Sequence, residues 1–260
     1  MSDSPSLRGF HREQRSSNRP IWREAFVGLD WVALHSSPIY YGLGVPKGDK
    51  SAVILVPGFM GTDLYLHELH YWFKRVGYRP YRSGIGWNAE CINTLVGRLS
   101  DTVLKANRET GRRVHLIGHS LGGILARATT ALNPDPIASV TTLGSPFRGI
   151  QSHPLVLAAA KGVRSRIRRL GGKYEPGCYT GYCGCNSVEV LQQELPAHVT
   201  QTAIYTKTDG IVDWRVCLSD VPERNVEVTG THVGLAFNAA VYKVLVHRLK
   251  QAHGSAVFEI

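Results

Sequence analysis

The stretch Val114-His-Leu-Ile-Gly-His-Ser-Leu-Gly-Gly-Ile-Leu125 decides the fold of this 260-residue chain. It opens with a short apolar run, residues 114–117, that is typical of a buried strand, and a helical pattern begins at Leu121. Between the two lies the pentapeptide Gly118-His-Ser-Leu-Gly122. A strand that turns sharply into a helix strains its central residue and leaves no room for a Cβ at the flanking positions. The pattern therefore predicts that Ser120 projects a reactive hydroxyl at the start of a helix.

Short apolar runs and helical patterns alternate on both sides of this turn. Such alternation favours parallel strands joined by crossover helices. We therefore expect an α/β fold with a mostly parallel central sheet of about six strands, flanked by helices. The predicted strands are residues 51–56, 78–81, 114–117, 140–143, 202–206 and 226–228, and the main predicted helices are 63–76, 89–110, 121–132 and 234–249.

The chain reads as one domain, residues 20–260, preceded by a flexible arm, residues 1–19. A helical pattern follows Pro20, and its apolar face is expected to pack on the body of the protein. That face carries Trp22, Ala25, Phe26 and Leu29.

Residues 147–198 interrupt the alternation of strands and helices. A long insertion in a compact domain is often functional, and we expect a lid or cap here. Its first part combines an apolar stripe at helical spacing with neighbouring arginines. A basic amphipathic lid would suit a lipid–water interface, whereas a plain cap helix would pack its stripe on the domain. The stripe consists of Leu155, Ala158, Ala159, Val163, Ile167 and Leu170.

The composition limits the classes of partner. The formal net charge is +10, which favours anionic surfaces such as phospholipid or nucleic acid. The sequence contains no nucleic-acid-binding motif, so we expect no nucleic-acid partner and keep peripheral contact with an anionic lipid surface as a prediction. No apolar run is long enough to span a bilayer, and the N-terminus has no apolar secretory segment, so a cytoplasmic location is expected.

The sequence offers no pattern typical of a metal or cofactor site, and we expect neither. His67 and His70 lie three residues apart on a predicted helix, which is not the spacing of a zinc-binding helix. The disulfide pattern cannot be assigned from the cysteines, which are Cys91, Cys178, Cys183, Cys185 and Cys217.

Five motifs in this order resemble those of the α/β-hydrolase family, and within it the bacterial lipases and esterases. The resemblance covers roughly residues 51–252. It implies a carboxylic ester hydrolase, an esterase or lipase, that works through an acyl-enzyme without a cofactor. Two alternatives stay open: an acyltransferase with the same residues, and a catalytically silent module that binds partners or membranes. The motifs are Val53–Gly61, Gly118–Gly123, Leu143–Gly149, Thr208–Val212 and Gly230–Gly234.

The resemblance implies a catalytic triad. Ser120 is the implied nucleophile, and His232 is the implied base because it follows the last predicted strand. Asp209, in an Asp-Gly-x-Val pattern, matches the acid of the family, with Asp213 as its competitor. The acid orients the imidazole and stabilises its protonated form.

The same resemblance implies the groups that surround the reacting ester. The backbone N–H groups of Phe59 and Leu121 are the implied donors to the oxyanion. Met60, Phe147 and Ile211 are expected to line the substrate site. Because these side chains are apolar, the predicted substrate is a small-molecule acyl ester or a lipid with an apolar acyl group.

Overall fold

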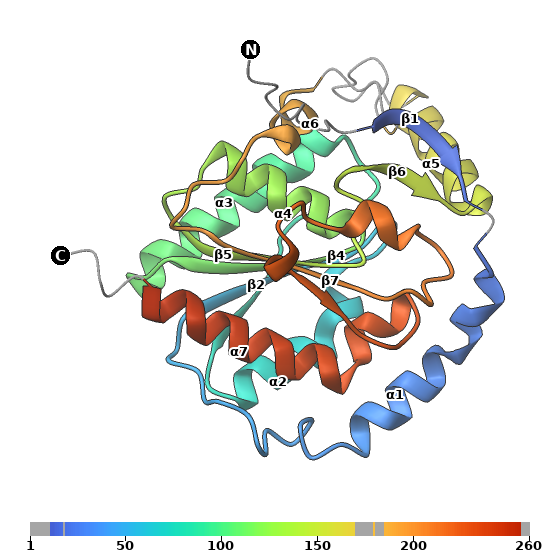
Figure 1. Cartoon of the computed structure of the whole chain (residues 1–260). Coiled ribbons are helices and arrows are strands. Elements are labelled where there is room, and N and C mark those ends of the chain that lie inside the picture. The colour runs from blue at the N-terminus through green and yellow to red at the C-terminus, as the bar shows by residue number, and fades with distance from the viewer. Residues whose placement is uncertain (1–10, 18, 170–178, 180–184, 256–260) are drawn as a thin grey trace, which may run out of the picture.

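A central sheet of six strands, all parallel, forms the middle layer of the protein in a computed structural model (Figure 1). The structure describes residues 11–17, 19–169, 179 and 185–255. The parallel sheet and its strand number confirm the predicted α/β architecture. In spatial order the strands are β3 (Arg79–Arg82), β2 (Ala52–Val56), β4 (Val114–His119), β5 (Ile137–Leu143), β7 (Thr200–Tyr205) and β8 (Asn225–Glu227).

Helices cover both faces of this sheet. In Figure 1, α3 (Ile92–Thr110) and α4 (Leu121–Leu132) lie on one face, and α2 (His67–Arg75) and α7 (Ala239–Ser255) lie on the other. The two faces have separate apolar cores, and alternate residues of one strand enter different cores. Ile54 packs on the α3 and α4 side, whereas Val53 and Leu55 pack on the α2 side. This two-sided burial explains why the strands are continuous apolar runs.

Short 3₁₀ helices connect several of these elements. They do not alter the parallel topology. Their bounds are η2 (Asp63–Leu66), η4 (Trp214–Cys217), η5 (Pro222–Arg224) and η6 (Val233–Phe237).

The described part of the segment between β5 and β7 packs on the same side of the sheet as α3 and α4 and shares their apolar core. Its elements are β6 (Gly149–Ser152), α5 (Pro154–Arg169), α6 (Asn186–Glu189) and η3 (Val190–Gln192). The predicted stripe on α5 is right in part: Val163 and Ile167 are buried, but Leu155 is 63% exposed. Leu170 lies outside the described residues.

The N-terminal arm differs from the expectation of a flexible segment. Residues 11–16 form strand β1 (His11–Ser16), which pairs in parallel with β6. Because β6 lies outside the central sheet, its edge has backbone groups that an extended polar segment can satisfy. Residues 1–10 and 18 lie outside the described part of the chain.

The helical segment after Pro20 is present as η1 (Ile21–Phe26) and α1 (Val27–His35), but the predicted packing face is wrong. Trp22, Phe26 and Leu29 are 62%, 49% and 65% exposed. The contacts with the body are made instead by Glu24, Asp30 and the buried Leu34. Hydrogen bonds that these two carboxylates accept, rather than the apolar stripe, fix the rotation of the segment.

No helix within the described residues is long and apolar enough to cross a membrane. Cys217 is a buried free thiol, and its Sγ lies 3.8 Å from the carbonyl oxygen of Asp213. Cys178 and Cys183 lie outside the described residues, so the structure does not test whether they form a disulfide.

Candidate active site

Ser120 lies in the sharp turn between β4 and α4. Its φ is 52° and its ψ is −123°, a conformation that a non-glycine residue rarely adopts. A Cβ on Gly118 would lie 2.3 Å from the carbonyl oxygen of Gly122, and one on Gly122 would lie 2.3 Å from the carbonyl oxygen of Val56. Contacts this close exclude any side chain, which is the physical reason for both glycines of the pentapeptide.

Backbone N–H groups are available beside this serine. Leu121 is the first residue of α4, so its N–H has no partner within the helix. In the loop after β2, the N–H of Met60 donates to the carbonyl of Asn88 and that of Gly61 to the carbonyl of Gly58. The N–H of Phe59 has no acceptor among the described residues. The positive end of the α4 dipole adds to the attraction for a negative charge here.

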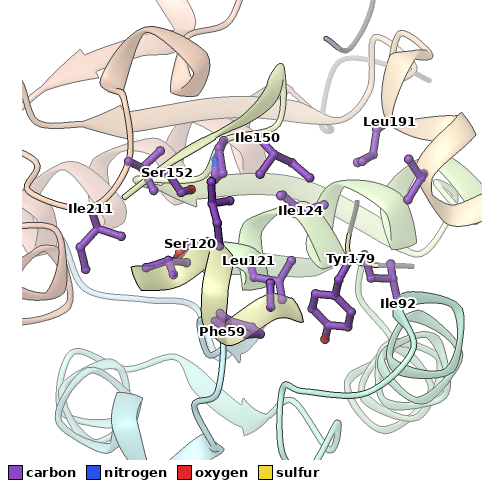
Figure 2. Close-up of a pocket in the computed structure, with 16 residues that line it drawn as sticks. Phe59, Ile92, Ser120, Leu121, Ile124, Ile150, Ser152, Tyr179, Leu191 and Ile211 are labelled. Carbon is purple, nitrogen blue, oxygen red and sulfur yellow. The ribbon is translucent and has the colours of Figure 1, made fainter. Parts of the chain in front are cut away.

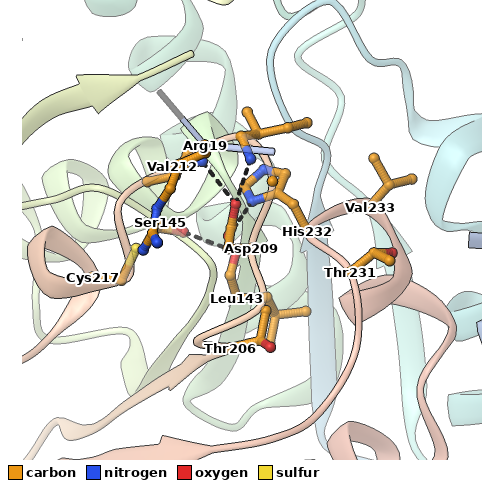
Figure 3. Close-up of polar contacts among 12 residues, drawn as sticks. Arg19, Leu143, Ser145, Thr206, Asp209, Val212, Cys217, Thr231, His232 and Val233 are labelled. Atoms are coloured by element: carbon orange, nitrogen blue, oxygen red, sulfur yellow. Dashed lines mark hydrogen bonds and ion pairs between the residues drawn. The ribbon is translucent and has the colours of Figure 1, made fainter. Parts of the chain in front are cut away.

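His232 and Asp209 form a buried pair. The Nδ1 atom of His232 lies 2.6 Å from Oδ2 of Asp209, and the side chains are 3% and 1% exposed (Figure 3). Asp209 follows β7 and His232 follows β8, so both come from the carboxyl ends of strands, as Ser120 does. Parallel strands present these ends at one edge of the sheet.

The other oxygen of Asp209 is also fixed. Oδ1 accepts hydrogen bonds from the N–H groups of Ile211 at 2.8 Å and Val212 at 2.7 Å. Asp213, the competing candidate, instead forms an ion pair with Arg19 at 3.4 Å and caps η4. The geometry therefore pairs His232 with Asp209 and not with Asp213.

His119 forms a hydrogen bond with the loop that carries His232. Its Nε2 donates to the carbonyl oxygen of His232 at 2.9 Å, so its ring links β4 to this loop. Burial, with the charge of His232 second, lowers the pKa of His119 to about 3. The His119 ring is therefore neutral at physiological pH.

Burial disfavours the charged form of His232, but two carboxylates oppose it. The charge and hydrogen bond of Asp209, with the charge of Glu24, outweigh the burial and raise the pKa of His232 above 6.5. The two carboxylates therefore stabilise the charge that the ring gains when it takes up a proton.

Two adjoining pockets open at Ser120. One is apolar, lies beneath α5 and is lined by residues that include Ser120, Leu121, Ile124, Leu157 and Ala160 (Figure 2). The second includes Ser120, His232 and Gly58. Within the described residues no hydrogen bond joins the hydroxyl of Ser120 to the ring of His232, but both side chains line this second pocket.

The three residues predicted to contact substrate have different positions. Ile211 lines both pockets, and Met60 lines the second one. Phe147 lines neither: it is 6% exposed in the core, with the guanidinium of Arg127 4.4 Å from its ring centre. The cation–π contact and the core packing turn this ring away from the site.

Comparison with known proteins shows which fold this geometry belongs to. Residues 110–174 match the family described as alpha/beta hydrolase fold. The chain also superimposes on a candidate lipase from Acinetobacter baumannii with a TM-score of 0.54, at 13% identity over 87% of this chain and 97% of that one. A metagenome-derived lipolytic enzyme gives a TM-score of 0.52, at 14% identity over 80% and 96%.

This chain has the α/β-hydrolase fold.

Among curated proteins, this hydrolase-fold chain is similar to bacterial lipases. It is 31% identical to a triacylglycerol lipase of Burkholderia plantarii over 132 residues, which are 47% of this chain and 37% of the relative. It is 36% identical to a triacylglycerol lipase of Pseudarthrobacter phenanthrenivorans over 106 residues, 37% and 33% of the two chains. The matched region thus spans about a third of the length of these relatives.

Two kinds of residue at this candidate site could not be predicted from the sequence. The wall of the apolar pocket includes Ile150, Val156 and Leu157, which lie in the insertion and match no motif. Glu24 and Asp30, from the N-terminal helices, contact the loops of the acid and the histidine. Glu24 and Asp30 are two of four acidic residues among residues 1–35, so the composition of this segment does not single them out.

Proposed function

We propose that this chain is a carboxylic ester hydrolase, an esterase or lipase, with Ser120, His232 and Asp209 as its catalytic triad. The observation that carries the proposal is the buried Asp209–His232 pair at 2.6 Å, whose histidine lines one pocket with the strained Ser120. The similarity to triacylglycerol lipases over part of the chain supports the same class of reaction.

The reaction proceeds by two acyl transfers. Oγ of Ser120 attacks the ester carbonyl carbon while Nε2 of His232 takes the hydroxyl proton, and Asp209 stabilises the imidazolium. The tetrahedral intermediate then collapses, and the alkoxide leaving group takes the proton from His232. Water attacks the resulting acyl-enzyme by the reverse sequence, with His232 again as the base, and releases the carboxylic acid.

The N–H groups of Phe59 and Leu121 are the proposed donors to the oxyanion. Phe59 lies in the loop after β2 and Leu121 begins α4, both at the carboxyl edge of the sheet. Neither N–H has an acceptor among the described residues. One such donor contributes on the order of 3 kcal/mol to the transition state in other hydrolases.

The proposed substrate carries an apolar acyl chain. The pocket beside Ser120 is lined mainly by aliphatic side chains, those of α4 and α5 among them, with Tyr179 and Phe59 at one side (Figure 2). An apolar lining favours an alkyl chain over a sugar or peptide, because the polar groups of a sugar or peptide would find no hydrogen-bond partners in this pocket.

Hydrolysis of p-nitrophenyl esters from acetate to palmitate tests this function. We expect release of p-nitrophenol, with a preference for acyl chains that fill the apolar pocket. An added alcohol that captures most of the acyl group would favour the acyltransferase. Absence of turnover, together with failure to react with a fluorophosphonate, would favour the silent module.

Filling the acyl pocket should change the chain-length preference. Ala160 lines the pocket, so we expect Ala160→Phe to lower kcat/KM for octanoate by about 10-fold or more relative to acetate, since one methylene of misfit changes rates 10- to 200-fold. Ala158→Phe is the matched control, because Ala158 is exposed on the same helix. An unchanged octanoate-to-acetate ratio in Ala160→Phe would refute the assignment of this pocket.

We further propose that residues 147–198 act as a lid or cap and touch an anionic lipid surface. Helix α5 covers the apolar pocket, and its outer side carries exposed Leu155, Lys161 and Arg169. Each basic side chain near such a surface contributes about 1 kcal/mol.

Vesicle sedimentation tests the lipid contact. We expect stronger binding to phosphatidylglycerol-containing vesicles than to pure phosphatidylcholine, and a roughly 30-fold loss in the Lys161→Gln/Arg169→Gln double variant. The control is Lys243→Gln/Lys250→Gln, because these exposed lysines lie on α7, on the other side of the sheet. Equal binding to both kinds of vesicle would contradict the proposal.

A further inference from the structure

The carboxylate of Glu24, on η1, accepts three backbone hydrogen bonds from the far end of the chain. Oε1 accepts from the N–H of Gly210 at 3.0 Å and from that of His232 at 3.0 Å. Oε2 accepts from the N–H of Val233 at 2.9 Å. One side chain therefore uses both of its oxygens on backbone groups that are 186 to 209 positions away.

These three donors belong to the two loops that carry Asp209 and His232. Gly210 directly follows the acid, and the other two N–H groups belong to the histidine and its neighbour. The carboxylate of Glu24 thus links the two loops directly. The approach is close enough that a Cβ on Gly210 would lie 2.8 Å from Oε1 of Glu24.

Asp30, on α1, makes a second link to the same region. Its Oδ2 accepts from the N–H of Thr231 at 3.2 Å and from the hydroxyl of Thr231 at 2.8 Å. A Cβ on Gly234 would lie 1.9 Å from Oδ2 of Asp30, so this contact also requires a glycine. Glu24 and Asp30 together hold the loop from Thr231 to Gly234 against the N-terminal helices.

Hydrogen bonds of an ionised carboxylate to backbone N–H groups are about twice as strong as neutral ones. Loss of such an acceptor leaves partly buried donors without a partner, which is unfavourable. The structure therefore opposes any movement of the His232 loop away from the Asp209 loop.

We propose that Glu24 is a positioning residue that fixes the loops of Asp209 and His232 relative to each other, with Asp30 as a second anchor. This inference rests on the proposed function, because Glu24 acts through the triad and touches no reacting atom. It makes the N-terminal segment, η1 and α1, a part of the active-site framework.

The proposed role predicts a pH effect of known sign. The charged or titratable groups that face His232 are Asp209, Glu24, His119 and, next to Glu24, Tyr65. His119 is neutral because its pKa is about 3, and burial raises the pKa of Tyr65, so that phenol is also neutral. The two carboxylates therefore supply the charge that raises the pKa of His232, and removal of the Glu24 charge lowers it.

The histidine accepts the serine proton only in its neutral form, so kcat/KM falls as pH decreases through the pKa of His232. In the parent protein this acid limb is expected above pH 6.5. In Glu24→Gln the pKa of His232 is lower, so the limb moves to lower pH. At high pH, where the ring is neutral in both proteins, only the positioning effect remains.

The central experiment compares Glu24→Gln, Glu24→Asp and the exposed control Glu223→Gln, with rates normalised by active-site titration. For Glu24→Gln we expect kcat at high pH to fall about 10-fold, below the roughly 100-fold that a 1 Å misplacement can cost, while KM changes little. The acid limb should move to lower pH. Glu24→Asp keeps the negative charge but has a shorter side chain. We therefore expect kcat to fall while the acid limb of the pH profile stays at the same pH.

A merely structural role would lower the fraction of active protein without changing kcat per titrated site or the acid limb, and this result would overturn the proposal. Should Glu24→Gln fail to fold, Glu24→Asp and Asp30→Asn carry the same test: unchanged kcat per site in both would also overturn it. We expect Glu223→Gln to equal the parent.

NMR titration of the His232 ring separates this inference from the proposed function. If the parent cleaves no ester, the proposed function fails, and the titration then tests the contact between Glu24 and His232 by itself. The ring must then titrate at lower pH in Glu24→Gln than in the parent. Identical titration curves would refute the electrostatic contact.

Discussion

Replacement of Ser120 by alanine is expected to lower kcat for p-nitrophenyl esters roughly 10⁶-fold, the loss seen when the nucleophile of a serine hydrolase is removed. The hydroxyl is the only group of Ser120 that forms the acyl-enzyme, and the turn that presents it does not depend on it. Alanine also tolerates the turn no worse than serine, since both carry a Cβ at φ of 52°. The variant should therefore fold, and circular dichroism and denaturant midpoint should match those of the parent.

The matched control is Ser165→Ala, an exposed serine on α5 that lines neither pocket. We expect it to keep the parent rate. A folded Ser120→Ala protein with more than about one hundredth of the parent rate would contradict the role of Ser120, because the remaining N–H donors and binding account for only about 10³- to 10⁴-fold over water.

Asp209→Asn is expected to lower kcat by about 10⁴-fold with little change in the structure of the pocket. The amide keeps the shape of the side chain but can donate to Nδ1 of His232, which favours the wrong tautomer and no longer stabilises the imidazolium. The carboxylate also accepts from the N–H groups of Ile211 and Val212, and the amide oxygen can still accept both.

Asp213→Asn is the matched control for Asp209→Asn. Asp213 lies four residues further along the same loop, pairs with Arg19 and caps η4. We expect its substitution to change kcat less than a few-fold. Equal losses in the two variants, or a larger loss in Asp213→Asn, would reverse the assignment of the acid.

The sheet and the serine turn could be predicted because short-range rules determine them. Buried parallel strands must be apolar on both faces, so runs such as residues 52–56 stand out in the sequence. The turn requires glycines because a Cβ on Gly118 or Gly122 would lie 2.3 Å from a backbone carbonyl oxygen. These backbone atoms cannot shift without disturbing the strand or the helix. Residues at the carboxyl ends of parallel strands meet at one edge, which brings Asp209 and His232 together.

The remaining errors concern long-range packing. Periodicity indicated that Trp22, Phe26 and Leu29 share a face, but it could not show that Glu24 and Asp30 dock the helices through backbone N–H groups near the C-terminus. In the same way, the position of Phe147 depends on Arg127, which lies on another element. Partners so distant along the chain leave no periodic signal.

Reaction with a fluorophosphonate, followed by peptide mapping by mass spectrometry, is the most direct test of Ser120 as the nucleophile. We expect one phosphonyl adduct on Ser120, faster labelling as pH rises through the pKa of His232, and no adduct in Ser120→Ala. A folded parent protein that forms no adduct, or forms it on a residue other than Ser120, would refute this role of Ser120.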